Sequence, residues 1–149
     1  MKKLTLLALV ATLAIGSSSA LLAAEENADS LPQILKTAEA SKKPVVLEFT
    51  GSDWCPPCKM MQKEVFSTPD FQKFAASDIV FVKLDFPRQR DQDAAVKARN
   101  RELAEKFNVE GFPTVIVLDE KGKELGRKVG FGSGGPEAFI DWVKKSAKL

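Results

Sequence analysis

The two cysteines of this chain lie three positions apart, in the stretch Trp54-Cys55-Pro56-Pro57-Cys58-Lys59, and the sequence contains no others. The run before them, 45–49, is apolar apart from Glu48 and favours a buried strand. The residues after them, 59–66, repeat apolar side chains at helical spacing. Two intervening residues let the sulfur atoms meet across one helical turn, so a disulfide can form and break without moving the rest of the fold. The stretch therefore predicts a strand, a short loop and a helix that carries a redox-active cysteine pair at its start.

The first 24 residues have the pattern of a secretory signal peptide. Two lysines give the start a positive charge, and residues 4–15 are apolar but too short to span a bilayer. Small residues follow, and their spacing predicts cleavage after Ala20, with cleavage after Ala24 as the alternative. We expect the segment 1–24 to be removed and 25–149 to form one domain. A retained membrane anchor is the competing interpretation.

Charge and cysteine content limit the functions to consider. The sequence has 22 Lys and Arg against 20 Asp and Glu, and two of the lysines belong to the predicted signal. Without those two lysines the charges balance, so no basic excess points to a nucleic-acid partner. Export implies an oxidising compartment, where disulfides persist. A disulfide that closes so short a loop stabilises a fold little, which favours chemistry over a structural role for the pair.

The remaining patterns predict alternating helices and strands. Their order is helix, strand, two helices, strand, helix, two strands and helix, which implies an α/β fold with a mixed sheet of four or five strands and helices on both faces. The expected strands are 45–49, 79–84, 113–118 and 124–129. The mixed-charge run 88–93 is interpreted as a solvated loop. A charged helix is predicted over 94–107, with Ala95, Ala98, Leu103 and Phe107 facing inward and Arg99-Asn100-Arg101 on its surface.

Four separated motifs, taken in order, resemble those of the thioredoxin superfamily over residues 44–147. They are Trp54-Cys55-x-x-Cys58-Lys59, the strand that carries Lys83, Phe112-Pro113-Thr114, and Lys128-Val129-Gly130. Within that superfamily, the stretch 64–70 and the longer segment before Ala94 look most like an exported subgroup. That subgroup is similar to the C-terminal periplasmic domain of the transmembrane thiol:disulfide interchange reductase. The resemblance implies a free-standing thioredoxin-like domain that needs an electron donor or acceptor.

The two cysteines are predicted to have different roles. Cys55, at the start of the helix, faces unpaired N–H groups and the positive end of the helix dipole, which lower the pKa of a thiol. Cys55 is therefore the predicted nucleophile, and Cys58, one turn deeper, would resolve the mixed disulfide. Pro56 and Pro57 suit a first helical turn, where a missing N–H costs least. A static disulfide is the alternative.

Few cofactors suit these two sulfurs. Structural zinc normally takes about four nitrogen or sulfur ligands, and the sequence has two cysteines and no histidine. Lys59 follows Cys58 where a c-type haem attachment requires histidine. A copper site built from the two thiolates stays an alternative. We expect no metal and no organic cofactor, with the cysteine pair itself as the redox centre.

The resemblance also implies a role for Glu48 and Lys83. Thioredoxins keep a buried carboxylate on the central strand behind the resolving cysteine, and Glu48 matches that position, with Lys83 matching a nearby lysine. Burial should raise the pKa of such an acid and let it pass protons to or from Cys58. The sequence departs from the family in having Glu rather than Asp and one extra residue in the loop before Cys55. An outward-facing acid or a Glu48–Lys83 ion pair without a proton role is the alternative.

Phe112-Pro113 resembles the cis-proline element of the family, which packs against the cysteine pair and offers backbone to an extended substrate. A trans, strand-opening proline is the alternative. The predicted substrate-binding residues are this element and the exposed apolar side chains around the cysteine pair. The alternative is that these apolar side chains only pack in the core. The residues predicted to bind substrate are Trp54, Pro56, Pro57, Phe112 and Pro113, with Phe131 expected at the same docking face.

The residues between the cysteines bear on the direction of electron flow. Two prolines remove N–H donors that would stabilise the Cys55 thiolate, and no histidine lies between the cysteines. Both features favour a reducing or interchange potential. We expect a periplasmic, monomeric thiol:disulfide oxidoreductase of the protein-disulfide reductase type, without stable membrane insertion, that acts on protein thiols and disulfides and takes electrons from a membrane-bound donor. A disulfide-forming oxidase and a non-catalytic binding or chaperone module are the alternatives.

Overall fold

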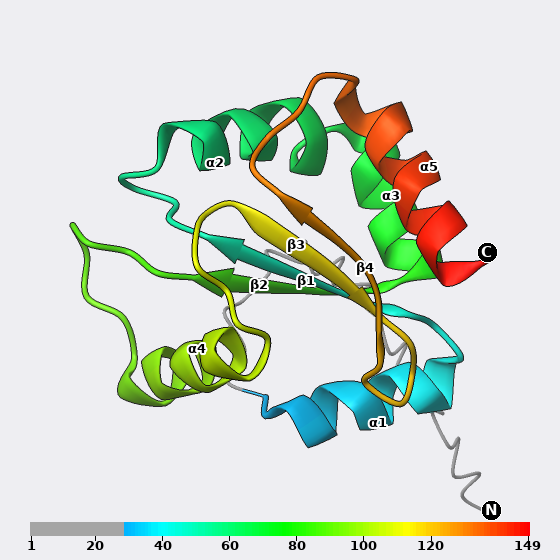
Figure 1. The fold of residues 1–149 in the computed structure, drawn as a ribbon, viewed down its shortest axis with the longest axis horizontal. Coiled ribbons are helices and arrows are strands. Elements are labelled where there is room, and N and C mark those ends of the chain that lie inside the picture. Colours follow the sequence, from blue (N-terminus) through cyan, green and yellow to red (C-terminus); the bar gives the residue numbers. More distant parts are fainter. Residues whose placement is uncertain (1–28) are drawn as a thin grey trace, which may run out of the picture.

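The computed structural model describes residues 29–149, so the predicted signal peptide at 1–24 and its cleavage sites lie outside the described residues. The elements follow in the predicted order (Figure 1). They are α1 (Leu31–Ser41), β1 (Val45–Thr50), α2 (Pro56–Met61), the π-helical turn η1 (Gln62–Phe66), α3 (Pro69–Asp78), β2 (Val80–Asp85), α4 (Ala94–Lys106), β3 (Thr114–Leu118), β4 (Glu124–Val129) and α5 (Gly135–Ala147).

The four strands form one mixed sheet in the order β2-β1-β3-β4. Strand β1 pairs in parallel with β2 and antiparallel with β3, and β4 pairs antiparallel with β3 as a hairpin. In this register Glu48 lies between Lys83 of β2 and Val115 of β3. The mixed sheet that we predicted is therefore confirmed with four strands among residues 29–149, and it places Glu48 on a central strand.

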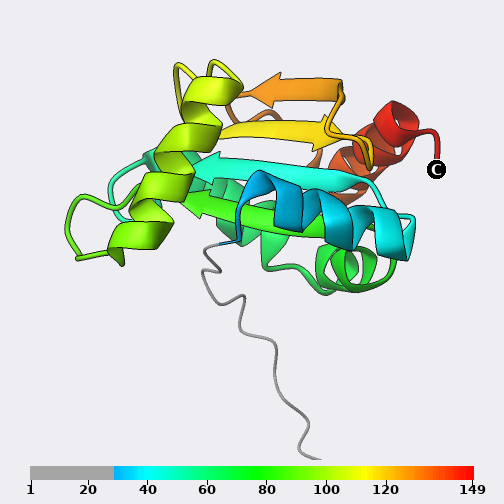
Figure 2. The ribbon, with the colours of Figure 1, turned by 90° about the horizontal axis from the view of Figure 1, so that it is seen from below.

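Each face of the sheet has its own apolar core. Val45, Leu47 and Phe49 pack with α1 and α4, whereas Val46 packs with residues of α2, η1, α3 and α5. Figures 1 and 2 show the sheet between these two groups of helices. Successive side chains of a strand point to opposite faces. Glu48 therefore shares a face with Val46 and points to the side covered by α2.

Side-chain caps determine where two of the helices begin. The Thr68 hydroxyl accepts a hydrogen bond from the Phe71 N–H at 3.4 Å at the start of α3. The Asp93 carboxylate accepts from the N–H groups of Ala95 at 2.8 Å and Val96 at 3.2 Å at the start of α4. These bonds satisfy N–H groups that have no partner within the helix. Asp93 thereby also ends the loop that follows β2.

The helix predicted after the cysteines is divided into two parts. Its first six residues form α2, and the next five form the wider π-helical turn η1, in which the Ser67 N–H donates to the Gln62 carbonyl at 2.8 Å. The Gln62 side chain reinforces the turn by donating to the Ser67 hydroxyl at 3.0 Å. The consecutive residues Val65 and Phe66 are both buried. Apolar periodicity indicates a helix here but does not distinguish the two kinds of turn.

The prediction for α4 was partly wrong. Leu103 and Phe107 are buried as predicted, but Ala95 and Ala98 are exposed. Arg99 and Asn100, which we predicted on the surface, are 5 % and 1 % exposed. Their polar groups are buried because they bond inside the protein: the Asn100 amide donates to the Asp85 carbonyl at 2.7 Å, and the Arg99 Nε–H donates to the Asn100 side-chain oxygen at 2.8 Å. Partners of this kind let polar side chains occupy a buried helix face.

Candidate functional site

The cysteine pair lies where β1 gives way to α2. Cys55 immediately precedes α2, and its N–H donates to the Gly51 carbonyl at 2.9 Å. Its Sγ is bonded to the Sγ of Cys58 at 2.05 Å, and the two residues are 3 % and 1 % exposed. Pro56 and Pro57 occupy the first two positions of α2, and Pro56 is exposed. The predicted strand, loop and helix with a cysteine pair at the start are confirmed.

The loop before Cys55 is attached to the end of β2 through Asp85. This residue is fully buried. Its carboxylate accepts from the Ser52 N–H at 2.8 Å and from the Ser52 hydroxyl at 2.5 Å. The Arg90 guanidinium pairs with the same carboxylate at 2.6 Å. A buried carboxylate with these partners is satisfied, so Asp85 connects the redox loop to the segment after β2.

Asp53 makes a second attachment to that segment. Its carboxylate accepts from the backbone N–H groups of Arg88 at 3.0 Å and Gln89 at 2.8 Å. Partial desolvation raises the pKa of Asp53, but these N–H groups outweigh it and hold the pKa below its usual value. Residues 88–93 are therefore a largely solvated loop, as predicted, but its first two residues are hydrogen-bonded to the redox loop.

Trp54 is held on several sides. Its indole N–H donates to the Phe86 carbonyl at 2.7 Å. The Arg88 guanidinium lies 3.6 Å from the ring centroid, and the Phe112 ring packs edge-on at 5.9 Å between centroids. A Cβ atom at Gly51 would lie 2.5 Å from the indole, so glycine is needed there for space. Trp54 is half-buried, so part of its side chain stays exposed while these contacts hold the ring in place.

We predict that Arg88→Ala exposes the Trp54 indole to water. In a Trp142→Phe background, where Trp54 is the remaining tryptophan, its fluorescence emission should shift to longer wavelength. An exposed cation–π contact contributes on the order of 0.5–1 kcal/mol, so the free energy of unfolding should fall by no more than about that amount. Arg101→Ala, at an exposed position of α4, is the control. Equal emission spectra for both variants would contradict the Arg88 contact.

Glu48 is fully buried, and neither of its carboxylate oxygens has a hydrogen-bond partner. Burial raises the pKa of Glu48 to about 7. The charge of Lys83 and the nearby Thr50 hydroxyl lower this pKa, and the charge of Asp85 raises this pKa further. The Thr50 hydroxyl is close to the Glu48 carboxyl group but does not reach hydrogen-bond geometry. An outward-facing acid is therefore excluded. The raised pKa gives Glu48 a neutral and an ionised form near neutral pH.

The Phe112–Pro113 peptide bond is cis, as the resemblance implied. Pro113 is buried, and its carbonyl accepts from the Gly130 N–H at 2.8 Å. The Phe112 ring lies between Trp54 and Phe86, stacked on Phe86 with 4.9 Å between centroids. The structure thus brings together the tryptophan before Cys55 and the residue before the cis-proline, which are 58 positions apart in the sequence.

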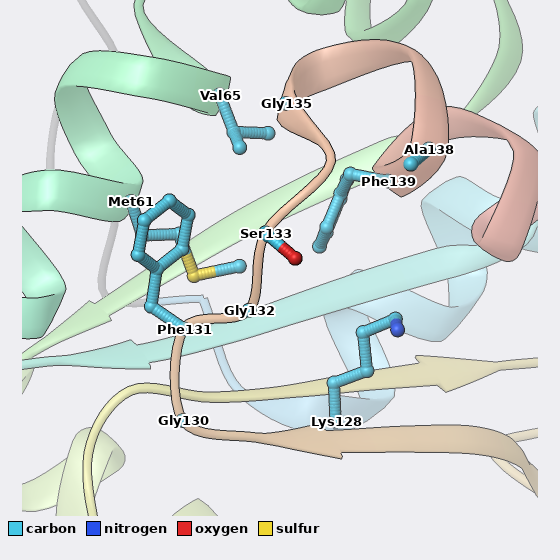
Figure 3. A pocket seen from close by; sticks show the side chains of 10 residues that line it. All are labelled: Met61, Val65, Lys128, Gly130, Phe131, Gly132, Ser133, Gly135, Ala138 and Phe139. Atoms are coloured by element: carbon cyan, nitrogen blue, oxygen red, sulfur yellow. The ribbon is translucent and has the colours of Figure 1, made fainter.

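Phe131 lies at a separate place. It lines a small pocket of about 60 Å³ between η1, the loop 130–135 and the start of α5. Figure 3 shows Met61, Phe131 and Ser133 around this pocket. No ring contact joins Phe131 to Trp54 or Phe112 among the described residues. Of the predicted docking face, Trp54 and Phe112 are in direct contact. Phe131 belongs to the neighbouring loop, which is attached to the cis-proline element by the hydrogen bond from the Gly130 N–H to the Pro113 carbonyl.

Sequence reasoning missed Asp85, Asp53 and Arg88 as parts of the site. An acid that ends an apolar strand, as Asp85 ends β2, was a usable signal because strand ends often carry functional groups. Across residues 29–149 no group of three or more His, Cys, Asp or Glu side chains is placed to hold a metal ion. In the same range no helix is both long and apolar enough to cross a membrane.

Comparison with known proteins places this geometry in a family. The family model described as a thioredoxin-like domain matches residues 31–147. The chain belongs to the thioredoxin-like family. It is 36 % identical over 121 residues to the "Disulfide bond reductase DsbH" of Chlamydia pneumoniae, with 81 % of this chain and 72 % of that protein covered.

Two further matches agree with this family. The solved structure "DsbH Oxidoreductase" superposes with a TM-score of 0.75 at 36 % identity, covering 81 % of this chain and 83 % of that one. The "Thiol:disulfide interchange protein DsbD" of Pasteurella multocida (strain Pm70) is 29 % identical over 126 residues, covering 83 % of this chain but 20 % of that protein. The chain thus spans about a fifth of the interchange protein. The predicted resemblance and the predicted fold class are both confirmed.

Proposed function

We propose that this protein is a thiol:disulfide oxidoreductase of the protein-disulfide reductase type, with Cys55 and Cys58 as its redox centre. The observation that carries the proposal is the disulfide between Cys55 and Cys58 at the first turn of α2, beside a tryptophan that contacts the residue preceding a cis-proline. The relatives named as a disulfide bond reductase and as a thiol:disulfide interchange protein support the same chemistry. No bound cofactor is needed, because the sulfur pair itself carries the electrons.

In the reduced protein the Cys55 thiolate would attack a sulfur of the partner's disulfide. That step forms a mixed disulfide and releases one partner thiolate, which takes up a proton. Cys58, once deprotonated, would then attack Cys55, forming the Cys55–Cys58 disulfide and releasing the second partner thiolate. Two electrons pass to the partner in total. Cys55 is assigned as nucleophile because it precedes α2 and meets the positive end of the helix.

Glu48 is our candidate for the group that accepts the proton of Cys58. It points to the face that α2 covers, and a pKa of about 7 suits an acid that must both take and return a proton near neutral pH. Lys83, its neighbour in register on β2, would limit how far that pKa rises. Both residues therefore act on the proton balance of the exchange, and neither makes contact with the substrate.

Partner proteins would dock over Trp54, Pro56, Pro57 and the cis-proline element. The Pro113 carbonyl is already bonded to Gly130, so the backbone of Phe112 is the part left for an extended partner strand. The Phe112 ring, wedged between Trp54 and Phe86, forms one wall of this site. A bulky residue at this position would favour partner segments with small side chains next to the cysteine.

We place this activity in the periplasm. The signal-like pattern before Ala20 and Ala24 supports export, and residues 25–149 would form the mature, monomeric domain. A reductase in an oxidising compartment must be kept reduced. A membrane-bound electron donor is therefore the proposed source of electrons, and protein disulfides are the proposed acceptors.

The reduction potential of the Cys55–Cys58 pair tests the direction of electron flow. We expect a value near that of thioredoxin, on the order of −270 mV, when the purified protein is equilibrated with a dithiothreitol couple. A strong oxidant has a reduced form in which hydrogen bonds stabilise the thiolate. Pro56 and Pro57 have no N–H groups to donate such bonds to Cys55, which disfavours a strongly oxidising potential. A value near about −120 mV would instead support the disulfide-forming oxidase and redirect the search to an electron acceptor.

A further inference from the structure

A pocket of about 290 Å³ adjoins Cys58 and shares no lining residue with the pocket beside the loop 130–135. Its walls come from the end of β1, from α2 and η1, and from β2. The residues that matter here are Cys58, Thr50, Ser67 and three lysines, Lys59, Lys63 and Lys83. The pocket therefore adjoins the resolving cysteine, and it has no part in the docking of partner proteins proposed above.

The charge around this pocket is one-sided. Three lysines line it and no acidic side chain does. Within residues 29–149 none of the three ammonium groups forms an ion pair, whereas Arg90 and Arg127 do. Lys59 lies in α2, and Lys63 lies four positions later in η1. Glu48, the register neighbour of Lys83, is buried in the sheet and does not line the pocket. Lys83 interacts with the buried Glu48 carboxyl group, but no acid on the pocket wall balances Lys59 and Lys63.

Neutral donors complete the lining. The Ser67 hydroxyl oxygen accepts a hydrogen bond from the Gln62 amide at 3.0 Å, which leaves its O–H free to donate into the pocket. Thr50 adds a second hydroxyl at the carboxyl end of β1, next to the parallel strand β2. The carboxyl ends of parallel strands are a common place for ligands in α/β proteins. A ligand with several oxygen acceptors and at least two negative charges matches this set of groups.

We propose that this pocket is a binding site for a small oxyanion, of the phosphate or polycarboxylate class, held by Lys59, Lys63 and Lys83. Ammonium groups that surround an anion in a partly enclosed site hold it by charge-assisted hydrogen bonds. The volume of the pocket admits a phosphate ester or a tricarboxylate as well as a single inorganic phosphate.

Binding here should depend on the redox state, because Cys58 lines the same pocket. Reduction by dithiothreitol breaks the S–S bond with two electrons, and dithiothreitol becomes its cyclic disulfide. Where the reduced pair keeps Cys55, the assigned nucleophile, as a thiolate, that negative charge lies within one helical turn of Cys58 in the pocket wall and repels an anion in the pocket. The oxidised protein should therefore bind the anion more tightly than the reduced protein. By reciprocity, the anion would favour the disulfide by the same factor.

The test is a titration of the oxidised, isotope-labelled protein with inorganic phosphate and, separately, with citrate, followed by NMR. We expect saturable shifts of backbone amides at 50–52, 58–67 and 83, with a Kd on the order of 1 mM or tighter for at least one anion. The double variant Lys59→Gln/Lys63→Gln should bind about ten-fold more weakly, because it loses two ion pairs. Both lysines are exposed, so their replacement leaves the fold intact.

The matched control is Lys73→Gln/Lys97→Gln, which removes two exposed lysines of α3 and α4 and so changes the net charge equally. Its affinity should stay within about two-fold of the wild type. Binding of phosphate alone would assign the phosphate class, and binding of citrate alone the polycarboxylate class. Absence of saturable shifts at concentrations on the order of 10 mM, or equal weakening in both double variants, would overturn the site.

The same titration at about pH 8 with the reduced protein tests the link to the cysteines. We expect about three-fold weaker binding than in the oxidised protein. Equal affinity in the two redox states would overturn the link between the pocket and the redox pair. These measurements read anion binding and not disulfide reduction, so their outcome is independent of the function proposed above.

Discussion

Replacing Cys55 by serine should reduce the rate of protein-disulfide reduction by at least about a thousand-fold, equivalent to about 4 kcal/mol in the barrier. A serine hydroxyl does not ionise near neutral pH, so the variant lacks the thiolate that must attack the partner's disulfide. The measurement is reduction of a model disulfide protein with dithiothreitol as the electron source. Cys55 is buried at the start of α2, and serine is close to cysteine in size, so the replacement changes the packing little.

Cys58→Ser provides the matched variant. It keeps Cys55, so the first step still occurs, but the second thiol that would release the partner is absent. Mixed disulfides with partner proteins should therefore accumulate in Cys58→Ser and be absent from Cys55→Ser. Full activity of Cys55→Ser, or partner binding that is the same in both variants and in the wild type, would support the non-catalytic binding module instead.

Replacing Glu48 by glutamine should change how the stability of the oxidised protein depends on pH. Burial raises the pKa of Glu48 from 4.5 to about 7, so the folded state favours the neutral acid. The stability that follows from this preference is fully present below about pH 4.5 and is lost as the pH rises through about 7. A shift of this size corresponds to about 3 kcal/mol.

Glutamine keeps the shape of the side chain and does not ionise. The difference in unfolding free energy between Glu48→Gln and the wild type should therefore move by about 3 kcal/mol in favour of the variant between about pH 4 and pH 8. Denaturant unfolding at a series of pH values measures it. Glu64→Gln, which removes one acid at an exposed position of η1, is the control variant. A constant difference for Glu48→Gln would mean that Glu48 is not held neutral by burial.

The cysteine motif and the order of helices and strands could be predicted from local sequence patterns. The cysteine pair, the strand before it and the helix after it are evident in one continuous stretch, because the periods of a strand and a helix are local properties. The order of elements could also be predicted, since caps and turn residues mark the ends of helices within a few positions. The cis bond at Pro113 followed from the family resemblance.

Other features of the site depend on contacts between residues far apart in the sequence. Ser52, Asp53 and Trp54 bond to residues 32 to 36 positions away. Each of these bonds requires the parallel register of β1 and β2 and the path of the loop after Asp85. A mixed-charge run such as 88–93 predicts a solvent-exposed loop, because most runs of mixed charge lie on the surface. Nothing in its local pattern indicates that Arg88 covers a tryptophan.

Spacing and periodicity were enough to predict a cysteine pair at the start of a helix in an α/β fold, because both are properties of short stretches of the chain. Which polar groups are buried, and which charges share a cavity, follows from the folded arrangement and not from any one stretch. Glu48 lacks a hydrogen-bond partner, and Asn100 turns inward to the Asp85 carbonyl. Lys59, Lys63 and Lys83 line one pocket together with Cys58. Desolvation and electrostatic interaction depend on distances through space, and the folded chain sets those distances.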